Sequence, residues 1–360
     1  ALIALKNHPK IKLQVVVASS ALLDRYGSAV NYIEKDGFSI DAKVYNILEG
    51  ENNTVSAKTT GLGIIELSSV FENIKPDIVV TVADRFETMA TAIASSYMNI
   101  PLAHIQGGEV TGNIDEKVRH AITKLSHIHF TTNEEASNRL LAMGEEDWRV
   151  HTVGYPGIDL INAKEFYTPE EIVNKIPIDL NKPIIVFTQH SVSNKFNLVE
   201  KQLLPSLEAF DKLIKENDIQ CILTYPNNDA GGRKIIDAIN NFKNDELSDI
   251  KDIQIYTSLG RYNYHGVLAL ASDPDNKICC VGNSSSGLLE SPSLKVPVVN
   301  IGDRQSNRER GANVLDCKDN YKSINITEYV NLFTRTLSKC ILNKKLEKTN
   351  INKNKYKIIN

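Results

Sequence analysis

Short apolar runs rich in β-branched residues alternate with longer segments of helical periodicity along almost the whole chain. Such runs predict strands buried in a parallel sheet, and the longer segments predict the helices that cover it. The strands expected in the first half are Lys12–Ala18, Lys43–Ile47, Asp77–Val82, Leu102–Ile105, His129–Thr132 and Arg149–Val153. The helices expected between them are Ser56–Asn73, Glu87–Tyr97, Asp115–Leu125 and Glu134–Met143.

The same alternation resumes after Val153–Asp159, a stretch with Gly and Pro that suits a linker between domains. The strands expected in the second half are Pro183–Thr188, Gln220–Thr224, Asp252–Ile255, Lys277–Val281 and Val296–Asn300. The helices are Leu198–Glu216, Gly231–Asn241, Tyr262–Ala271, Gly287–Ser293 and Ile326–Leu337. This pattern predicts an α/β protein with two Rossmann-like domains whose parallel sheets face each other across a cleft.

We therefore expect an N-terminal domain over residues 1–154, a C-terminal domain over 155–340, and a tail over 341–360 that packs back on the first domain. The first residues have the pattern of a helix that leads into a strand, which is an unusual start for an α/β domain. The first strand of the N-terminal domain and its loop are thus expected to be missing from this chain.

Composition narrows the class of protein. The 360 residues are 42% apolar and 24% charged with a net charge of -3, which predicts a globular protein with no nucleic-acid or membrane partner. No apolar run reaches the roughly 18 residues of a membrane span. The five cysteines are odd in number and form no C-x-x-C pair, which is typical of buried free thiols in a reducing compartment. We expect a cytoplasmic protein.

Acidic residues follow the expected strands of the first half. Because ligands of open α/β sheets bind beyond the carboxyl ends of the strands, Asp84, Glu109, Asp115 and Glu116 are candidate catalytic residues. Neighbouring carboxylates push their pKa values apart, which provides an acid and a base near neutral pH. The alternative for Asp84 is a helix-capping role, and the alternative for Asp115 or Glu116 is a favourable place at a helix start.

Basic residues lie close to these acids in the sequence. Arg85 is next to Asp84, whereas Arg119 and His120 are expected to anchor the acidic cluster rather than to react. His190 leaves the first strand of the second half and is a candidate proton donor or a partner for phosphate charge. No two histidines have the spacing of metal ligands, so no metal is expected.

A phosphate site is indicated by "GNSSSGLLE", where a buried strand runs into a helix. Backbone N–H groups and three hydroxyls at a helix start suit a diphosphate, and an ordinary Ser helix cap is the alternative. Neither a Walker loop nor G-x-G-x-x-G is present, which disfavours a nicotinamide cofactor, and no cofactor is expected. The candidate substrate-binding residues are Arg85, Asn283, Ser284, Ser285, Ser286, Gly287, Glu290 and Arg304.

The stretches "ADRFE", "HIQGGEVTG", "NIDEKVRHAITKLS", "TQHSVS", "GNSSSGLLE" and "VPVVNIGDRQ" resemble the UDP-N-acetylglucosamine 2-epimerase family, in its hydrolysing branch. The resemblance covers nearly the whole chain, and the motifs occur in the family's order. It implies two Rossmann-like domains similar to those of GT-B glycosyltransferases, and a homodimer or higher homo-oligomer.

The resemblance also implies a reaction. UDP-N-acetylglucosamine loses its C2 proton and its UDP to give 2-acetamidoglucal, and water adds to give N-acetylmannosamine for sialic acid synthesis. The acidic positions of the family match Asp84, Glu109 and the Asp115/Glu116 pair, and its histidine matches His190. The positions that bind UDP match Ser284, Ser285, Glu290 and Arg304, with Arg85 near the sugar.

The chain departs from the family in three places. It lacks the initial strand and its Arg-Ala-Asp-Tyr-like loop, it has Ala21 where a His is usual, and it lacks a Gly-Asp-Gly-like segment after Val314. The change at Ala21 leaves room for a related substrate, a UDP- or GDP-linked 2,4-diacetamido-2,4,6-trideoxy sugar on the legionaminic acid route. Two more function classes fit the same residues: a GT-B glycosyltransferase and a catalytically silent sugar-nucleotide-binding protein.

Overall fold

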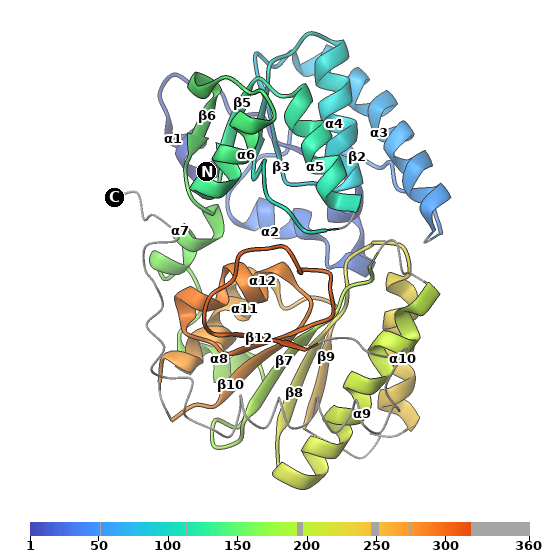
Figure 1. Cartoon of the computed structure of the whole chain (residues 1–360), viewed down its shortest axis with the longest axis vertical. Coiled ribbons are helices and arrows are strands. Elements are labelled where there is room, and N and C mark those ends of the chain that lie inside the picture. Colours follow the sequence, from blue (N-terminus) through green and yellow to red (C-terminus); the bar gives the residue numbers. More distant parts are fainter. Residues whose placement is uncertain (51, 113, 193–196, 246–251, 274, 318–360) are drawn as a thin grey trace. The chain divides into compact units, whose positions relative to one another are not determined.

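The computed structural model describes residues 1–317 apart from 51, 113, 193–196, 246–251 and 274. The chain divides into two compact α/β units (Figure 1). Within the described residues, unit 1 consists of Ala1–Val110 and Ile114–Pro156, and unit 2 consists of Thr111, Gly112 and Gly157–Cys317. The expected helix Ile326–Leu337 and the expected tail over 341–360 lie outside the described residues.

Unit 1 contains two parallel sheets, of strand order β1-β2 and β3-β4-β5-β6. Its strands are β1 (Val16–Ala18), β2 (Ala42–Val44), β3 (Val79–Val82), β4 (Leu102–Ile105), β5 (Ile128–Thr131) and β6 (Val150–Thr152). Its α-helices are α1 (Leu2–Asn7), α2 (Ala29–Lys35), α3 (Asn53–Ile74), α4 (Phe86–Tyr97), α5 (Ile114–Leu125) and α6 (Glu134–Ala142). Short 3-10 helices are η1 (Ser19–Leu22), η2 (Asp24–Tyr26) and η3 (Asp147–Arg149).

The core of unit 1 joins both sheets to the helices that cover them. Phe71 of α3, Ala90 of α4, Leu102 of β4 and Ile122 of α5 are buried in one apolar cluster with Val44 of β2. The sequence pattern predicts one sheet here, but among the described residues no strand pairs with both β1 and β3. The two sheets are therefore held together by side-chain packing and not by a continuous hydrogen-bond ladder.

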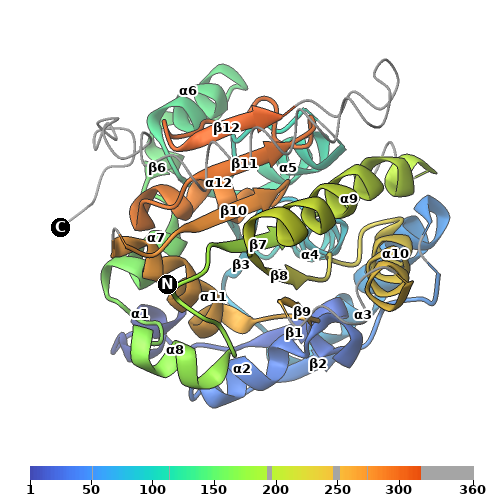
Figure 2. The ribbon, with the colours of Figure 1, turned by 90° about the horizontal axis from the view of Figure 1, so that it is seen from below.

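Unit 2 is built on one six-stranded parallel sheet of order β12-β11-β10-β7-β8-β9, which Figure 2 shows from below. Its strands are β7 (Ile184–Thr188), β8 (Gln220–Thr224), β9 (Ile253–Tyr256), β10 (Ile278–Gly282), β11 (Val298–Ile301) and β12 (Val314–Cys317). Its helices are α7 (Pro156–Asn162), α8 (Pro169–Lys175), α9 (Val199–Asn217), α10 (Gly232–Asp245), α11 (Gly260–Ala269) and α12 (Ser285–Leu289), followed by the 3-10 helices η5 (Leu270–Ser272) and η6 (Ser291–Leu294).

Both faces of this sheet are covered, as the near-continuous apolar strands predict. Phe187 of β7 points to the face under α9 and α10, where its ring meets Phe210 edge-on at 4.8 Å. Val186 points to the opposite face, which α7, α8 and α11 cover. The carboxyl ends of all six strands lie at one edge of the sheet, and the candidate binding residues follow them there.

Several elements differ from the sequence prediction. The stretch expected to be a linker contains α7, which begins at Pro156, because the missing N–H of a proline costs nothing at a helix start. Helix α8 was not predicted, although Thr168 and Glu171 form a capping box beside Pro169, which is a readable start signal. Helix α2 and strand β12 were not predicted either.

The described residues bear on two further expectations. Cys221, Cys279, Cys280 and Cys317 are buried, as the sequence predicts, whereas Cys340 lies outside the described residues. Within the described part of the chain, no helix combines the length and the apolar character that a membrane crossing requires.

Candidate active site

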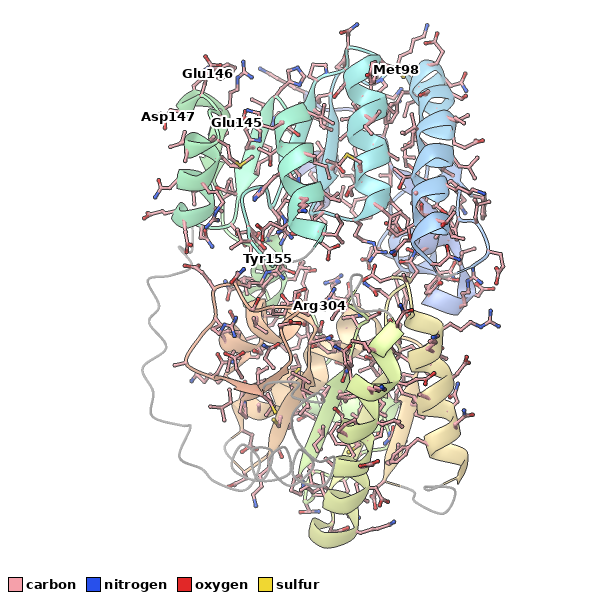
Figure 3. The ribbon with its side chains drawn as sticks, turned by 45° about the vertical axis from the view of Figure 1, so that its right-hand side comes forward. Met98, Glu145, Glu146, Asp147, Tyr155 and Arg304 are labelled. Carbon is pink, nitrogen blue, oxygen red and sulfur yellow. The ribbon has the colours of Figure 1, made fainter. Side chains whose placement is uncertain are left out.

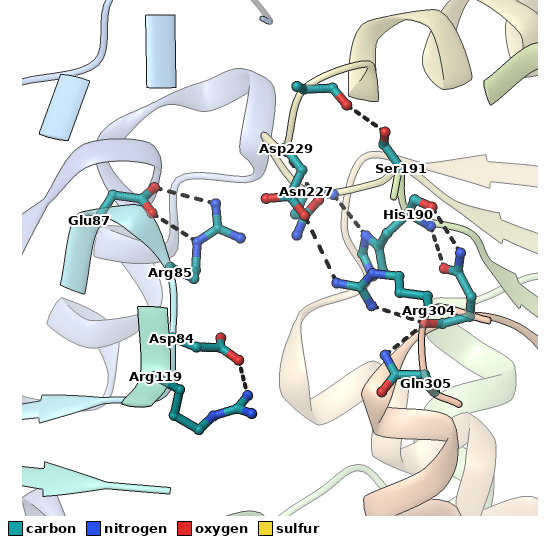
Figure 4. Close-up of polar contacts among 12 residues, drawn as sticks. Asp84, Arg85, Glu87, Arg119, His190, Ser191, Asn227, Asp229, Arg304 and Gln305 are labelled. Carbon is teal, nitrogen blue, oxygen red and sulfur yellow. Dashed lines mark hydrogen bonds and ion pairs between the residues drawn. The ribbon is translucent and has the colours of Figure 1, made fainter. Parts of the chain in front are cut away.

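One buried arginine of unit 1 contacts both Asp84 and the backbone of Glu109. Asp84 lies two residues after β3, and its carboxylate accepts a hydrogen bond from Arg119 of α5 (Figure 4). The Arg119 side chain is only 1% exposed, and its Nη1 donates to the backbone carbonyl oxygen of Glu109 at 2.7 Å. Arg119 thus anchors the Asp84 carboxylate, which is the part of the expected acidic cluster that it contacts through a side chain. Asp84 is not the cap of α4, because Arg85 occupies that position.

Glu109 is held on the same edge of the sheet, where it is 7% exposed and its Oε1 accepts from the Thr132 hydroxyl at 2.8 Å. The chain reaches this position through Gly108, which has a φ of +82°. An added Cβ at Gly108 would lie 2.4 Å from the carbonyl oxygen of Ala136, so no other residue fits there. The two-glycine turn therefore serves close packing against α6, and it presents Glu109 beyond the end of β4.

The remaining acidic and basic candidates of unit 1 lie on helix starts. Asp115 and Glu116 are in the first turn of α5, where the helix dipole favours negative charge. Arg85 pairs with Glu87, its Nε donating to Oε2 at 3.0 Å (Figure 4). Glu87 is a neighbour that the sequence reasoning did not assign to Arg85.

In unit 2, His190 follows β7 and is fixed by its surroundings (Figure 4). The Asn283 side chain accepts from the His190 backbone N–H at 2.7 Å and donates to its carbonyl oxygen at 2.9 Å. The Asn227 backbone N–H donates to His190 Nδ1 at 3.1 Å. Since this bond uses the Nδ1 lone pair, the neutral ring carries its proton on Nε2 and can donate from there.

Asn283 is in turn held by the loop after β11. Arg304 Nη1 and Gln305 Nε2 donate to its carbonyl oxygen at 3.0 and 3.1 Å, and Arg304 lies 3.9 Å from Asp229. Asn283 is 4% exposed, and its buried side chain supports His190 through the two hydrogen bonds to the His190 backbone. The sequence analysis did not select Asp229. The stretch "YPNND" marks the end of a strand, but it does not indicate which of its residues lies near Arg304.

The Ser-rich loop leads from β10 into α12. Ser284 occupies the cap position of α12 but makes no capping hydrogen bond with its side chain, so the ordinary cap predicted as the alternative is absent. Ser285 and Ser286 open the helix, and Gly287 is buried. A Cβ at Gly287 would lie 3.3 Å from Val298 Cγ1, which shows that this glycine serves close packing of α12 on the sheet.

Next to this loop, unit 2 has a pocket of about 430 Å³, of a size that suits a nucleoside. Ser284, Ser286 and Glu290 line it on one side, and the residues between β9 and α11 line it on another. Glu290 Oε2 accepts from Ser286 at 2.8 Å and lies 3.0 Å from His265 Nε2, so the carboxylate has a defined orientation.

Two further residues of the pocket were missed in the sequence. The Ser286 hydroxyl oxygen lies 2.8 Å from the Tyr264 hydroxyl oxygen, and burial raises the pKa of Tyr264 well above its usual value, so this phenol stays neutral. His265 is 5% exposed on the same helix. The sequence signal for them was the pair Tyr264 and His265 near the start of a predicted apolar helix, "YNYHGVLAL". Such a pair is equally typical of residues that only pack in a protein core.

The chain matches the family model described as UDP-N-acetylglucosamine 2-epimerase over residues 3–357. It belongs to the UDP-N-acetylglucosamine 2-epimerase family. It is 35% identical to the hydrolysing UDP-N,N'-diacetylbacillosamine 2-epimerase of Legionella pneumophila over 314 residues, which cover 87% of this chain and 79% of that protein. It is 30% identical to the UDP-N-acetylglucosamine 2-epimerase of Neisseria meningitidis serogroup B over 323 residues, which cover 89% and 80%.

Solved structures of this epimerase family share the fold. The crystal structure of UDP-GlcNAc 2-epimerase from Neisseria meningitidis bound to UDP-GlcNAc superposes with a TM-score of 0.71 at 20% identity, covering 94% of this chain and 86% of that chain. A putative UDP-N-acetylglucosamine 2-epimerase from Listeria monocytogenes gives a TM-score of 0.73 at 19% identity, covering 96% and 84%. Both confirm the predicted α/β architecture of parallel sheets with a GT-B-like fold.

Proposed function

We propose that this member of the epimerase family is a hydrolysing enzyme, which converts a UDP-linked 2-acetamido sugar and water into UDP and the free sugar inverted at C2. The observation that carries the proposal is that Asp84 and Glu109 lie at the carboxyl edge of one sheet, where Arg119 bonds the Asp84 carboxylate and the backbone carbonyl oxygen of Glu109. Removing a proton from C2 and returning one to it requires a base and an acid in one place.

The reaction divides into two steps. In the first, one carboxylate takes the C2 proton, the C1–O bond to the diphosphate breaks, and UDP leaves with the bonding electrons. In the second, water adds its oxygen to C1 of the 2-acetamidoglucal, and C2 receives a proton on the opposite face. Asp84, Glu109 and one of Asp115 and Glu116 share these proton transfers, with Arg85 beside the sugar.

Unit 2 is assigned to the nucleotide. Ser284, Ser285 and Ser286 would bind the diphosphate with their hydroxyls and with the N–H groups of α12, and Arg304 would neutralise its charge. Glu290 would accept hydrogen bonds from the ribose, since Ser286 and His265 already orient its carboxylate.

His190 would donate from Nε2 to the departing diphosphate. The bond from the Asn227 backbone N–H to Nδ1 supports this role, because it leaves the ring proton on Nε2. Asn283 supports His190 by bonding its backbone. Gly287 supports the serine loop by allowing α12 to pack closely on the sheet.

Two sugars are candidates. The similarity favours a diacetamido sugar, since the hydrolysing diacetylbacillosamine enzymes of Legionella pneumophila and Campylobacter jejuni are 35% and 32% identical to this chain. UDP-N-acetylglucosamine is the second candidate on the 30% identity to the Neisseria meningitidis enzyme. A cytoplasmic homodimer or higher homo-oligomer is also part of the proposal.

One assay in D2O tests the proposal. The purified protein is incubated with UDP-N,N'-diacetylbacillosamine and, separately, with UDP-N-acetylglucosamine, without any acceptor. The expected result is UDP together with a free C2-inverted sugar that carries one deuterium at C2. An inverted sugar still linked to UDP would mean a non-hydrolysing epimerase, and UDP release only after an acceptor is added would mean a transferase.

A further inference from the structure

The backbone before Asp84 has an unusual conformation. Ala83 lies between the end of β3 and Asp84 with a φ of +64°, in the left-handed region that a residue with a Cβ rarely adopts. Such a conformation persists only where surrounding contacts enforce it. The direction in which Asp84 leaves the strand depends on this turn, so the groups that hold Ala83 also orient the carboxylate.

Two hydrogen bonds from β4 hold Ala83. Its N–H donates to the carbonyl oxygen of Ile105 at 2.9 Å, and its own carbonyl oxygen lies 2.8 Å from His104 Nε2. A carbonyl oxygen can only accept, so His104 carries a proton on Nε2. The first bond continues the ladder between β3 and β4, whereas the second depends on one side chain.

The His104 ring is fixed on its other side as well. It is fully buried, and its Nδ1 lies 3.4 Å from the hydroxyl of Thr123 in α5, which can donate to it. A Cβ on Gly107 would lie 3.1 Å from His104 Nδ1 and 3.2 Å from Thr123 Oγ1, so the glycine backbone closes directly over the ring. Burial lowers the pKa of His104 to about 4, which keeps the ring neutral near pH 7 and preserves this arrangement.

We propose that His104 is a positioning residue for Asp84: through its Nε2–H it fixes the left-handed turn at Ala83 and so aims the carboxylate at Arg119. The inference rests on the proposed function, in which Asp84 takes part in proton transfer at C2. His104 itself touches neither substrate nor a reacting atom. If His104 served only to fill the core, its replacement could lower stability but would leave the kcat of the folded protein unchanged.

Two amide substitutions separate these roles. In H104Q, the amide nitrogen can take the place of Nε2 and donate to the Ala83 carbonyl, whereas in H104N it takes the place of Nδ1 and falls short. Both variants bury a similar polar group. We expect H104N to lower kcat roughly 10- to 100-fold and H104Q to stay within a few-fold of the wild type, because small misplacements of a catalytic group cost about this much. The dissociation constant for UDP should stay the same in both.

The control is H129Q. His129 is also fully buried and is paired with His104 across β4 and β5, but its Nε2 bonds Glu145 at 3.1 Å. Figure 3 shows Glu145 next to Glu146 and Asp147. They lie at the same end of unit 1 as Met98, the residue that follows α4. We expect this variant to keep the wild-type kcat.

A kcat for H104N equal to that of the wild type would overturn the inference, and so would an equal loss in H104N and H104Q. If the wild type turns over neither sugar nucleotide, the proposed function fails, and crystal structures of the two variants then decide the inference alone. The expected result is that Ala83 leaves the left-handed region in H104N and keeps it in H104Q. An unchanged positive φ in H104N would refute the role of His104.

Discussion

The side chain of Asn283 makes two hydrogen bonds to the backbone of His190: it accepts from the N–H at 2.7 Å and donates to the carbonyl oxygen at 2.9 Å. This pair links the end of β10 to the end of β7, two neighbouring strands of the sheet. The position of the histidine is therefore set by a residue 93 positions away in the sequence. A substitution of Asn283 should therefore change the position of His190.

We expect N283A to lower kcat roughly 10- to 100-fold, because the backbone of the proton donor loses the two bonds that the Asn283 side chain makes to it. The Asn283 carbonyl oxygen, which holds Arg304 and Gln305, is retained in this variant. Steady-state kinetics and calorimetry with UDP measure the effect. N276A is the matched control, since Asn276 bonds Leu270 near the other end of β10. Equal kcat values in the two variants would show that His190 needs no such support.

The acids of unit 1 should be dispensable for binding UDP but not for turnover. D84N keeps an oxygen that can accept from Arg119, and E109Q keeps one that can accept from Thr132, so both variants should fold. Each loses its proton-transfer group, and kcat should fall by about 10²-fold or more. D147N, at the far end of unit 1 in Figure 3, should behave as the wild type. A loss of UDP affinity in both acid variants would show that these residues are structural.

The sequence is sufficient to place these acids at one edge of a sheet. Leu102–Ile105 and Gln220–Thr224 are strands with the predicted bounds, and the others shift by a few residues. In parallel strands the carboxyl ends share an edge, so Asp84 and Glu109, which each follow a strand, had to lie at the same edge of the sheet. That argument needs only the order and type of the elements, which hydrophobic periodicity supplies.

The contacts within the site depend on information that periodicity does not carry. The left-handed turn at Ala83 is a backbone conformation that its sequence neighbours do not signal, since alanine usually avoids it. The pairing of Glu290 with His265 joins positions 25 residues apart, from two different parts of unit 2. Such pairs follow from the packing of elements, and a single sequence does not specify which polar side chains that packing brings together.

The stability of unit 1 should fall in mild acid because of His104. Burial lowers the pKa of this ring to about 4, from 6.5 in the unfolded chain, so the unfolded protein binds more protons between these two pH values. The free energy of unfolding therefore decreases as the pH falls through this window. From pH 7 to pH 5 the wild type should lose about 2 kcal/mol more than H104Q, which has no titrating group at this position.

Urea unfolding of both proteins at the two pH values measures this difference. The pKa values of His120 and His129 are also lowered by burial, but both residues are present in the two proteins, so their effects cancel. An equal loss of stability in the wild type and H104Q would mean that His104 becomes protonated in the folded state without penalty.

Glu290 should act on affinity and not on the chemical step. Its carboxylate is oriented by Ser286 and His265 inside the pocket of unit 2, where we place the ribose. Hydrogen bonds to the ribose are the same in the ground state and the transition state, so weakening them raises KM and leaves kcat unchanged. In E290Q a neutral oxygen replaces a charged acceptor, which makes those bonds about half as strong.

We therefore expect E290Q to raise KM for the sugar nucleotide about tenfold, equivalent to about 1.4 kcal/mol, with kcat within about threefold of the wild type. The inhibition constant of UDP should rise by the same factor, because UDP carries the same ribose. S293A is the control, since Ser293 is exposed on η6, three residues further along the chain. A collapse of kcat with an unchanged KM would place Glu290 among the groups that move protons and would contradict its assignment to the nucleotide.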